Sequence, residues 1–140
     1  MRKLSLLLLC WFILDTAAAQ QSDGYVNGLK KVAKGGKFGY VDSSGKVVVP
    51  CEYDDLGDFT DSKTPIRAKK DRNWGYVDCK GEKVTGFGYY YACPFYGEKL
   101  ALVCDMYYDA NSNSYFRYGY IDKNGKELIK CNEKSYKKAY

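Results

Sequence analysis

The sequence of 140 residues contains no histidine. Its absence removes the side chain that most often acts as a general base and as a zinc ligand. The six cysteines form no Cys-x-x-Cys pair, which disfavours a zinc site, and a cysteine nucleophile would lack a histidine to activate it. We therefore expect no catalytic residue, no metal and no cofactor, and we retain an enzyme only as a remote alternative.

Long apolar runs are also lacking, apart from one of 11 residues at Leu4–Leu14. Arg2 and Lys3 precede this run, and three alanines that end at Ala19 follow it, which is the pattern of a signal peptide. The alternative is a retained membrane anchor, but a bilayer span requires roughly 20 residues. We expect residues 1–19 to be a cleaved signal peptide, and the mature chain to be secreted, periplasmic or on the cell surface, without membrane insertion.

The predicted mature chain of 121 residues has the size of one domain. It carries 20 basic and 16 acidic residues, because the leader removes Arg2, Lys3 and Asp15. Lysines cluster between Lys30 and Lys37, but they alternate with other residues, and no arginine cluster is present. This pattern is typical of the solvated face of a strand and argues against nucleic acid as a partner.

A nine-residue motif occurs three times in the mature chain, in the form aromatic-Gly-Tyr-Val/Ile-Asp-x-x-Gly-Lys/Glu. Its repeat-defining residues are Phe38, Gly39, Tyr40, Asp42 and Gly45; Trp74, Gly75, Tyr76, Asp78 and Gly81; and Tyr118, Gly119, Tyr120, Asp122 and Gly125. The motif glycines are offset by 36 residues and then by 44. Self-similarity at such a period predicts a repeat array.

The similarity extends beyond the motif. With the offset of 36, Tyr53 aligns with Tyr89, Phe59 with Phe95 and Ile66 with Leu102. The eight additional residues of the second interval then fall within Asp105–Phe116. With the combined offset of 80, Pro50-Cys51 aligns with Lys130-Cys131.

The motif itself predicts a hairpin. An aspartate at the first position of a turn and a glycine at the fourth favour a type I turn followed by a left-handed residue. The glycine after the aromatic residue has no side chain, so we expect a neighbouring group to approach it closely. The pattern predicts an all-β fold, an antiparallel meander of eight or nine strands with no helix in the mature chain.

At these residues the sequence resembles the WG-repeat family. Trp74 to Asp78, Gly45 to Pro50, Tyr53-Asp54 and Leu100 to Val103 match the family pattern, whereas Phe38 and Tyr118 replace its tryptophan and Gly86 replaces its proline. The resemblance covers Leu29 to Cys131. It implies β-rich repeats and a binding or structural module, but no ligand. We expect one β domain at residues 24–133, with units at 29–36 (partial), 37–72, 73–117 and 118–133 (partial), and a frayed tail at 134–140.

Five cysteines remain in the mature chain, and an oxidising compartment would favour pairing of some of them. Connectivity does not follow from sequence. Cys93 and Cys104 are the preferred disulfide, whereas Cys51 and Cys131, at equivalent sites, are expected to be buried core residues. Acidic residues between Glu52 and Asp61 could form a calcium loop, but a polar turn is the better interpretation.

Tyrosine is abundant, with 15 residues, all in the mature chain. Consecutive rings in a strand cannot all face one core. Exposed tyrosines make effective contact surfaces. We expect Tyr90, Tyr91, Tyr107 and Tyr108 to bind a protein, peptide or glycan. The alternatives are that these rings fill a two-sided core, and that the array is a scaffold without a specific ligand.

Overall fold

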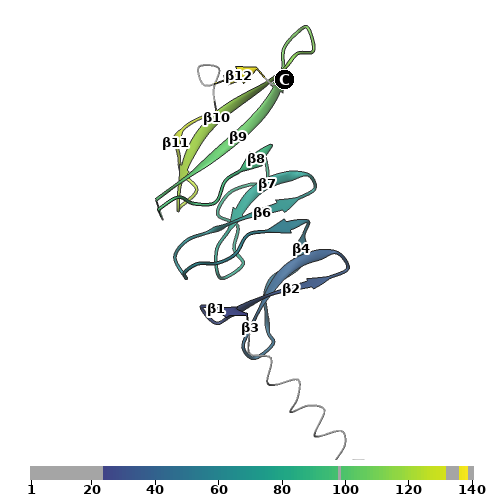
Figure 1. Ribbon diagram of the computed structural model, residues 1–140, viewed down its shortest axis with the longest axis vertical. Helices are drawn as coiled ribbons and strands as arrows, with labels where there is room; N and C mark the ends of the chain where they lie inside the picture. Colours follow the sequence, from purple (N-terminus) through teal and green to yellow (C-terminus); the bar gives the residue numbers. More distant parts are fainter. Residues whose placement is uncertain (1–23, 98, 132–135, 139–140) are drawn as a thin grey trace, which may run out of the picture.

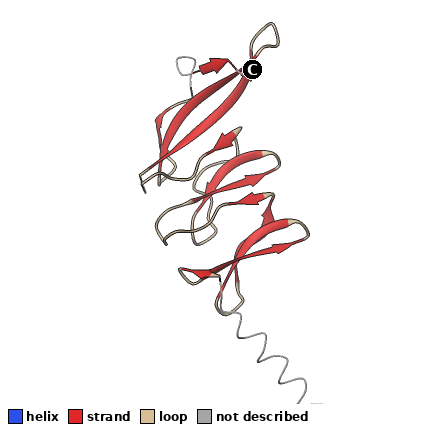
Figure 2. Ribbon diagram, viewed as in Figure 1, coloured by secondary structure: helices blue, strands red, loops and turns tan. Residues whose placement is uncertain are grey.

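The computed structural model describes residues 24–97, 99–131 and 136–138, so the expected signal peptide lies outside the described residues. The described chain is all-β, as predicted, and forms three antiparallel sheets. Figures 1 and 2 show these sheets one after another along the long axis of the molecule, in chain order. The chain is therefore a linear array.

Each sheet is built from consecutive strands. The first contains β1 (Tyr25–Val26), β2 (Leu29–Lys34), β3 (Lys37–Asp42) and β4 (Val47–Tyr53) in that order. The second contains β5 (Asp55–Leu56), β6 (Ile66–Lys70) and β7 (Asn73–Val77). The third has the order β11 (Glu127–Ile129), β10 (Ser114–Asp122), β9 (Leu100–Tyr108) and β8 (Tyr91–Ala92), with β12 (Tyr136–Lys138) also paired to β10.

The count of twelve described strands exceeds the expected eight or nine, because β1, β5 and β8 contain only two residues each and β11 and β12 only three. Strands this short leave little pattern in a sequence. The expected frayed tail is wrong for Tyr136–Lys138, which pair with Tyr115 to Arg117 of β10. The backbone hydrogen bonds of β10 thus order a segment that has no apolar alternation.

The predicted turn is present in all three motifs. In the first, the Asp42 carboxylate accepts hydrogen bonds from the backbone N–H groups of Ser44 and Lys46, at 2.9 and 3.0 Å. Asp78 and Asp122 accept the equivalent pairs of bonds. The motif glycines at the fourth position have φ between 78° and 84°, a left-handed conformation that glycine adopts without a steric penalty.

The glycine after the aromatic residue lies directly beneath a neighbouring segment of backbone. A Cβ built on Gly119 would lie 2.5 Å from the Ile129 carbonyl oxygen and 2.9 Å from the Cys131 nitrogen. A Cβ built on Gly39 would overlap the backbone of β4 in the same way, and one built on Gly75 would lie 2.7 Å from the Gly86 carbonyl oxygen. The expected close approach is therefore confirmed, and the approaching group is backbone.

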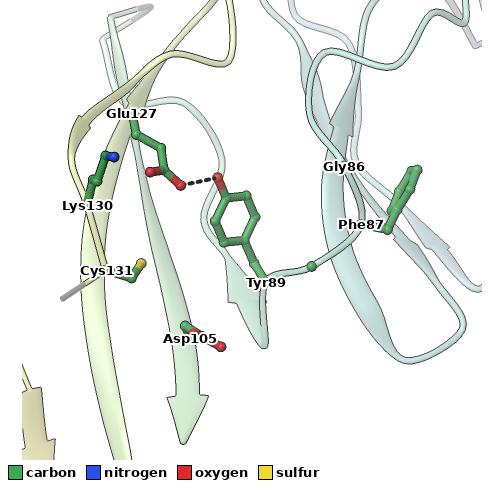
Figure 3. A pocket seen from close by; sticks show the side chains of 8 residues that line it. Gly86, Phe87, Tyr89, Asp105, Glu127, Lys130 and Cys131 are labelled. Atoms are coloured by element: carbon green, nitrogen blue, oxygen red, sulfur yellow. Dashed lines mark hydrogen bonds between the residues drawn. The ribbon is translucent and has the colours of Figure 1, made fainter. Parts of the chain in front are cut away.

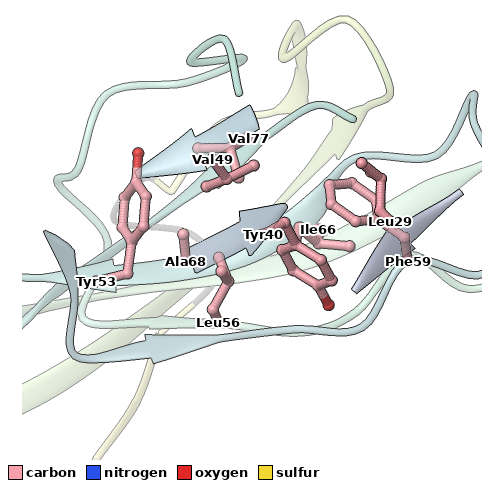
Figure 4. Close-up of a cluster of buried hydrophobic side chains, with 9 residues drawn as sticks. All are labelled: Leu29, Tyr40, Val49, Tyr53, Leu56, Phe59, Ile66, Ala68 and Val77. Atoms are coloured by element: carbon pink, nitrogen blue, oxygen red, sulfur yellow. The ribbon is translucent and has the colours of Figure 1, made fainter. Parts of the chain in front are cut away.

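Two hydrophobic cores lie between the sheets. The first core, shown in Figure 4, joins the first and second sheets and contains Leu29, Tyr40, Val49, Tyr53, Leu56, Phe59, Ile66, Ala68 and Val77. The second core joins the second and third sheets and contains Trp74, Tyr76, Ala92, Ala101, Val103 and Ile121. Because β7 contributes Val77 to one core and Tyr76 to the other, the middle sheet is buried on both faces.

The expected alignment of Ile66 with Leu102 is wrong by one residue. Ile66 pairs with Val77, and the equivalent motif residue Ile121 pairs with Ala101. Ala101 is accordingly buried, whereas Leu102 lies on the opposite face of β9. A shift of one residue along a strand exchanges its two faces, so the correction decides which side chain is core.

The insertion extends one hairpin. Between the paired residues Ala68 and Gly75 the chain has six residues, and between Val103 and Gly119 it has 15. The hairpin insertion is thus nine residues long. The loop that precedes β9 is one residue shorter than the equivalent loop before β6, which leaves the net difference of eight residues between the two motif intervals. At the tip, Asp109 forms the motif turn again, with Ser112 at φ 61° in place of glycine.

Candidate functional site

Three of the four tyrosines expected at a contact surface are exposed. The exposed fractions are 48% for Tyr90, 45% for Tyr91 and 63% for Tyr108. Tyr107 is half-buried and, as the neighbour of Tyr108 in β9, points to the other face of the hairpin. The four side chains therefore do not form one surface.

Tyr90 and Tyr91 lie beside the extended hairpin, where the structure forms what we call the tyrosine groove. It is a shallow cavity of about 210 Å³ lined by Tyr90, Tyr91, Cys104, Phe116 and Tyr118. The rings of Tyr90 and Phe116 lie 5.4 Å apart, and Tyr91 pairs with Cys104 across β8 and β9. Residues from two repeat units thus meet in one apolar depression.

The position of Tyr91 is determined by contacts with the second sheet. Its ring packs edge-on against Trp74 at 5.9 Å, and its hydroxyl oxygen accepts a hydrogen bond from Arg67 at 3.1 Å. The Arg67 guanidinium lies 4.9 Å from the centre of the Trp74 ring and also donates to the Ala92 carbonyl oxygen. These contacts hold one wall of the groove in a fixed orientation.

Phe116 and Tyr118, which line the groove, are not among the four tyrosines expected from the sequence. Alternation along β9 and β10 places Tyr108, Met106 and Cys104 on one face, opposite Ser114, Phe116 and Tyr118. That alternation is visible in the sequence, but the hairpin register is needed to use it. Tyr107 instead stacks on Tyr115 at 5.5 Å, beneath the Arg117 guanidinium.

A second depression, the inter-unit pocket, opens between the second and third sheets. It has a volume of about 490 Å³ and is lined by Gly86, Phe87, Gly88, Tyr89, Asp105, Glu127, Lys130 and Cys131. Figure 3 shows Tyr89 pointing toward Glu127, whose carboxylate accepts a hydrogen bond from the Tyr89 hydroxyl with an oxygen–oxygen distance of 3.4 Å. Burial, with Glu127 nearby, raises the pKa of Tyr89 to about 12, so its phenol is neutral at physiological pH.

Asp105 of the same pocket is paired with Arg117 at 2.7 Å. The pocket therefore offers a neutral phenol, an ion-paired carboxylate and the side chains of Glu127 and Lys130. Such groups can hold polar atoms by hydrogen bonding.

The expected Cys93–Cys104 disulfide is absent, since the cysteines of the described residues are all free. The backbone N–H of Cys93 donates to Leu102, whereas Cys104 pairs with Tyr91, so the two cysteines are two positions out of register. Burial raises the pKa of Cys104 to about 11, which keeps the thiol protonated at neutral pH. The equivalent residues Cys51 and Cys131 make equivalent contacts. The Cys51 thiol lies against the Val32 carbonyl oxygen of β2, and the Cys131 thiol lies against the Val103 carbonyl oxygen of β9.

The acidic residues of the candidate calcium loop are distributed over separate partners. Glu52 pairs with Lys70 at 3.1 Å, Asp58 with Lys31 at 2.6 Å, and Asp54 with Lys37. Asp61 accepts from the backbone of Lys63 and from Thr64 within its own turn. In the part of the chain that the structure describes, no group of three or more Cys, Asp or Glu side chains could hold a metal ion.

Comparison with known proteins gives one match. The sequence model of the family described as WG containing repeat matches residues 38–71 and 118–132. The unit around Trp74 lies between these segments and forms the same turn and glycine contact as they do. No curated protein and no solved structure matches the chain. Within residues 24–97, 99–131 and 136–138, no helix is long and apolar enough to cross a membrane.

Proposed function

We propose that the chain, of which residues 38–71 and 118–132 match the WG containing repeat, is a non-catalytic, exported binding module that takes an extended peptide or protein segment in the tyrosine groove. The observation that carries this proposal is the exposure of Tyr90 and Tyr91 beside Phe116, on a hairpin that the insertion has lengthened. Single exposed apolar residues are ordinary, but rings gathered over a groove indicate an interaction surface.

A peptide suits the groove better than a glycan. Its lining consists of aromatic rings with phenolic hydroxyls and one thiol, and it contains no carboxylate or amide side chain. Glycan recognition needs several hydrogen-bonding groups around the sugar, whereas rigid tyrosines bind peptide side chains at low entropic cost. Glycan binding is therefore the competing outcome.

The test is binding of the purified chain to an array of peptides eight to ten residues long, with a panel of soluble glycans in parallel. For the strongest peptide, Tyr90→Ala and Phe116→Ala should each weaken binding by roughly tenfold or more, the effect of removing an aromatic hot spot. Tyr96→Ala is the matched control, because Tyr96 is 89% exposed and lies outside the groove.

Equal peptide affinity of all three variants would contradict the assignment of the tyrosine groove as the binding site. Binding confined to glycans would replace the peptide as ligand. If neither the peptides nor the glycans bind, the alternative of a scaffold without a specific ligand takes the place of this proposal.

Export is part of the same proposal, and its support is the basic, apolar and small-residue order of residues 1–19. Expression with secretion should give a mature chain that begins at Gln20. N-terminal sequencing of the secreted protein measures this directly, and a chain that still begins at Met1 would contradict cleavage.

A further inference from the structure

The two ends of the array present complementary halves of the interface that joins its sheets. Inside the molecule, each sheet covers the aromatic face of the sheet before it. Tyr40 and Val49 of the first sheet are 3% and 0% exposed, because Ile66, Ala68 and Val77 of the second sheet cover them. The second core repeats this arrangement around Tyr76.

At the last sheet, no further sheet covers the same face within the part of the chain that the structure describes. Tyr120 and Ile129 occupy the positions of Tyr40 and Val49, offset by 80, and pair with each other as those residues do. Their exposed fractions are 39% and 53%. With Leu100 and Leu128, also exposed, they form what we call the C-terminal face.

The last sheet also lacks a basic side chain that the first and second sheets carry at one repeat position. Lys31 and Arg67 lie at one repeat position and donate to the Leu56 and Ala92 carbonyl oxygens of the next unit. By the corrected register, Leu102 occupies this position in β9. Leu102 joins Leu100 and Tyr120 in an apolar cavity of about 780 Å³.

The first sheet presents the opposite half. Val32, Val41 and Cys51, which we call the N-terminal face, are half-buried. The counterparts of Val32 and Val41, which are Ala68 and Val77 in the second sheet and Val103 and Ile121 in the third, are 1% exposed or less because a preceding sheet covers them.

The motif turns of the second and third sheets contact the backbone of the unit before them. A Cβ on Gly81 would collide with the Val48 carbonyl oxygen of the first sheet, and one on Gly125 with the Val84 carbonyl oxygen. Each turn is therefore packed against the preceding unit. A Cβ on Gly45, the equivalent turn residue of the first sheet, would meet nothing within 4 Å.

We propose that the N-terminal face of one copy of this chain docks on the C-terminal face of another, which continues the array from molecule to molecule. The Gly45 turn of one copy then lies over the Leu128 backbone of the other, and Val32 and Val41 cover Tyr120 and Ile129. The interface has the arrangement already present twice within the chain, as the stacked sheets of Figure 1 show. It is head-to-tail, so it produces open chains of molecules rather than a two-fold dimer.

The test is sedimentation velocity of the purified mature chain, which begins at Gln20, over a range of concentrations. The expected result is a series of oligomers that lengthens with concentration. Val32→Arg and Ile129→Arg each place a charge on one face, and each variant alone should be monomeric. Tyr108→Arg is the control, since Tyr108 lies at the end of β9 near the hairpin tip, six residues along the strand from Leu102, and it should assemble as the parent does.

The decisive measurement is the mixture of the two arginine variants. Each retains one intact face, so an equimolar mixture should form a one-to-one dimer and nothing larger. A parent chain that stays monomeric up to about millimolar concentration overturns the proposal, as does a mixture that fails to dimerise while circular dichroism shows both variants folded. Assembly that only one of the two variants abolishes would indicate a two-fold interface and would also overturn it.

Discussion

Two glycines in each motif have different physical roles. The glycine at the fourth turn position has a positive φ, whereas the glycine after the aromatic residue lies beneath a crossing backbone. At the second site the absence of a side chain matters for space rather than for backbone conformation. One residue type thus meets two separate requirements.

Replacement of Gly119 by alanine should reduce the free energy of unfolding by about 1–3 kcal/mol, because the new methyl group overlaps the backbone at Ile129 and Cys131. Urea denaturation measures the change. Gly88→Ala is the control, since a Cβ there would meet nothing within 4 Å. An equal loss in both variants would show that the close approach at Gly119 has no energetic consequence.

The Asp42 carboxylate should make folding pH-dependent. Hydrogen bonds from the Ser44 hydroxyl, and then from the backbone of Lys46 and Ser44, hold the pKa of Asp42 below its ordinary value of 3.8. Because the folded pKa is the lower one, the carboxylate stabilises the fold above about pH 4, and this contribution is lost as the pH falls through the folded pKa.

The variant Asp42→Asn should therefore lose less stability than the parent chain between pH 5 and pH 2.5. Thermal denaturation at both pH values measures the difference, and Ser43→Ala in the same turn serves as control. If the parent and Asp42→Asn lose stability equally, the turn carboxylate does not contribute to the acid sensitivity.

At the scale of the element, the register of β9 decides which residues are core. Ala101 is fully buried in the second core, and Leu102 points to the other face, at the position of Lys31 and Arg67. Local sequence favours leucine over alanine as a core residue. The pairing of β9 with β10 instead makes Ala101 the core residue, because successive side chains of a strand point to opposite faces.

Ala101→Lys should destabilise the chain by roughly 3–5 kcal/mol, since the charge would be buried without a partner. Leu102→Lys should change stability by about 1 kcal/mol or less, because the same position carries a basic residue in both earlier units. Circular dichroism during urea unfolding compares the two variants. A larger loss for Leu102→Lys would mean that the register of the sequence alignment, rather than that of the structure, is correct.

At the scale of the whole molecule, stability lies between the sheets. Both cores combine residues of two sheets, and β7 contributes to both of them. No sheet buries an apolar face by itself, so neighbouring units depend on one another, as in other repeat arrays. Unfolding of the third sheet should therefore affect the second.

Ile121→Ala should cost about 2–5 kcal/mol, because the side chain is fully buried and leaves a cavity. The fluorescence of Trp74 in the middle sheet and the circular dichroism of the whole chain should lose their folded signals at the same, lower urea concentration. Leu128→Ala, at an exposed site, should shift neither signal. Separate transitions for the two signals in Ile121→Ala would show that the sheets fold independently.

The sequence by itself determined the all-β class, the position of the three motif turns and the close approach at the second motif residue. These features depend on local chemistry, namely an aspartate that caps a turn, a glycine with positive φ and a glycine without a side chain. They can be read within nine residues of chain.

Only the tertiary structure decided four features. These are the register of β9, the placement of Tyr107 and Tyr108 on opposite faces, the difference in register between Cys93 and Cys104, and the exposure of Tyr120. Each depends on which strand lies beside or above a residue, and residues that make these contacts are far apart in sequence. Tyr40 and Tyr120 have nearly the same local sequence, yet one is core and the other surface, because a sheet covers the first within the described residues and none covers the second.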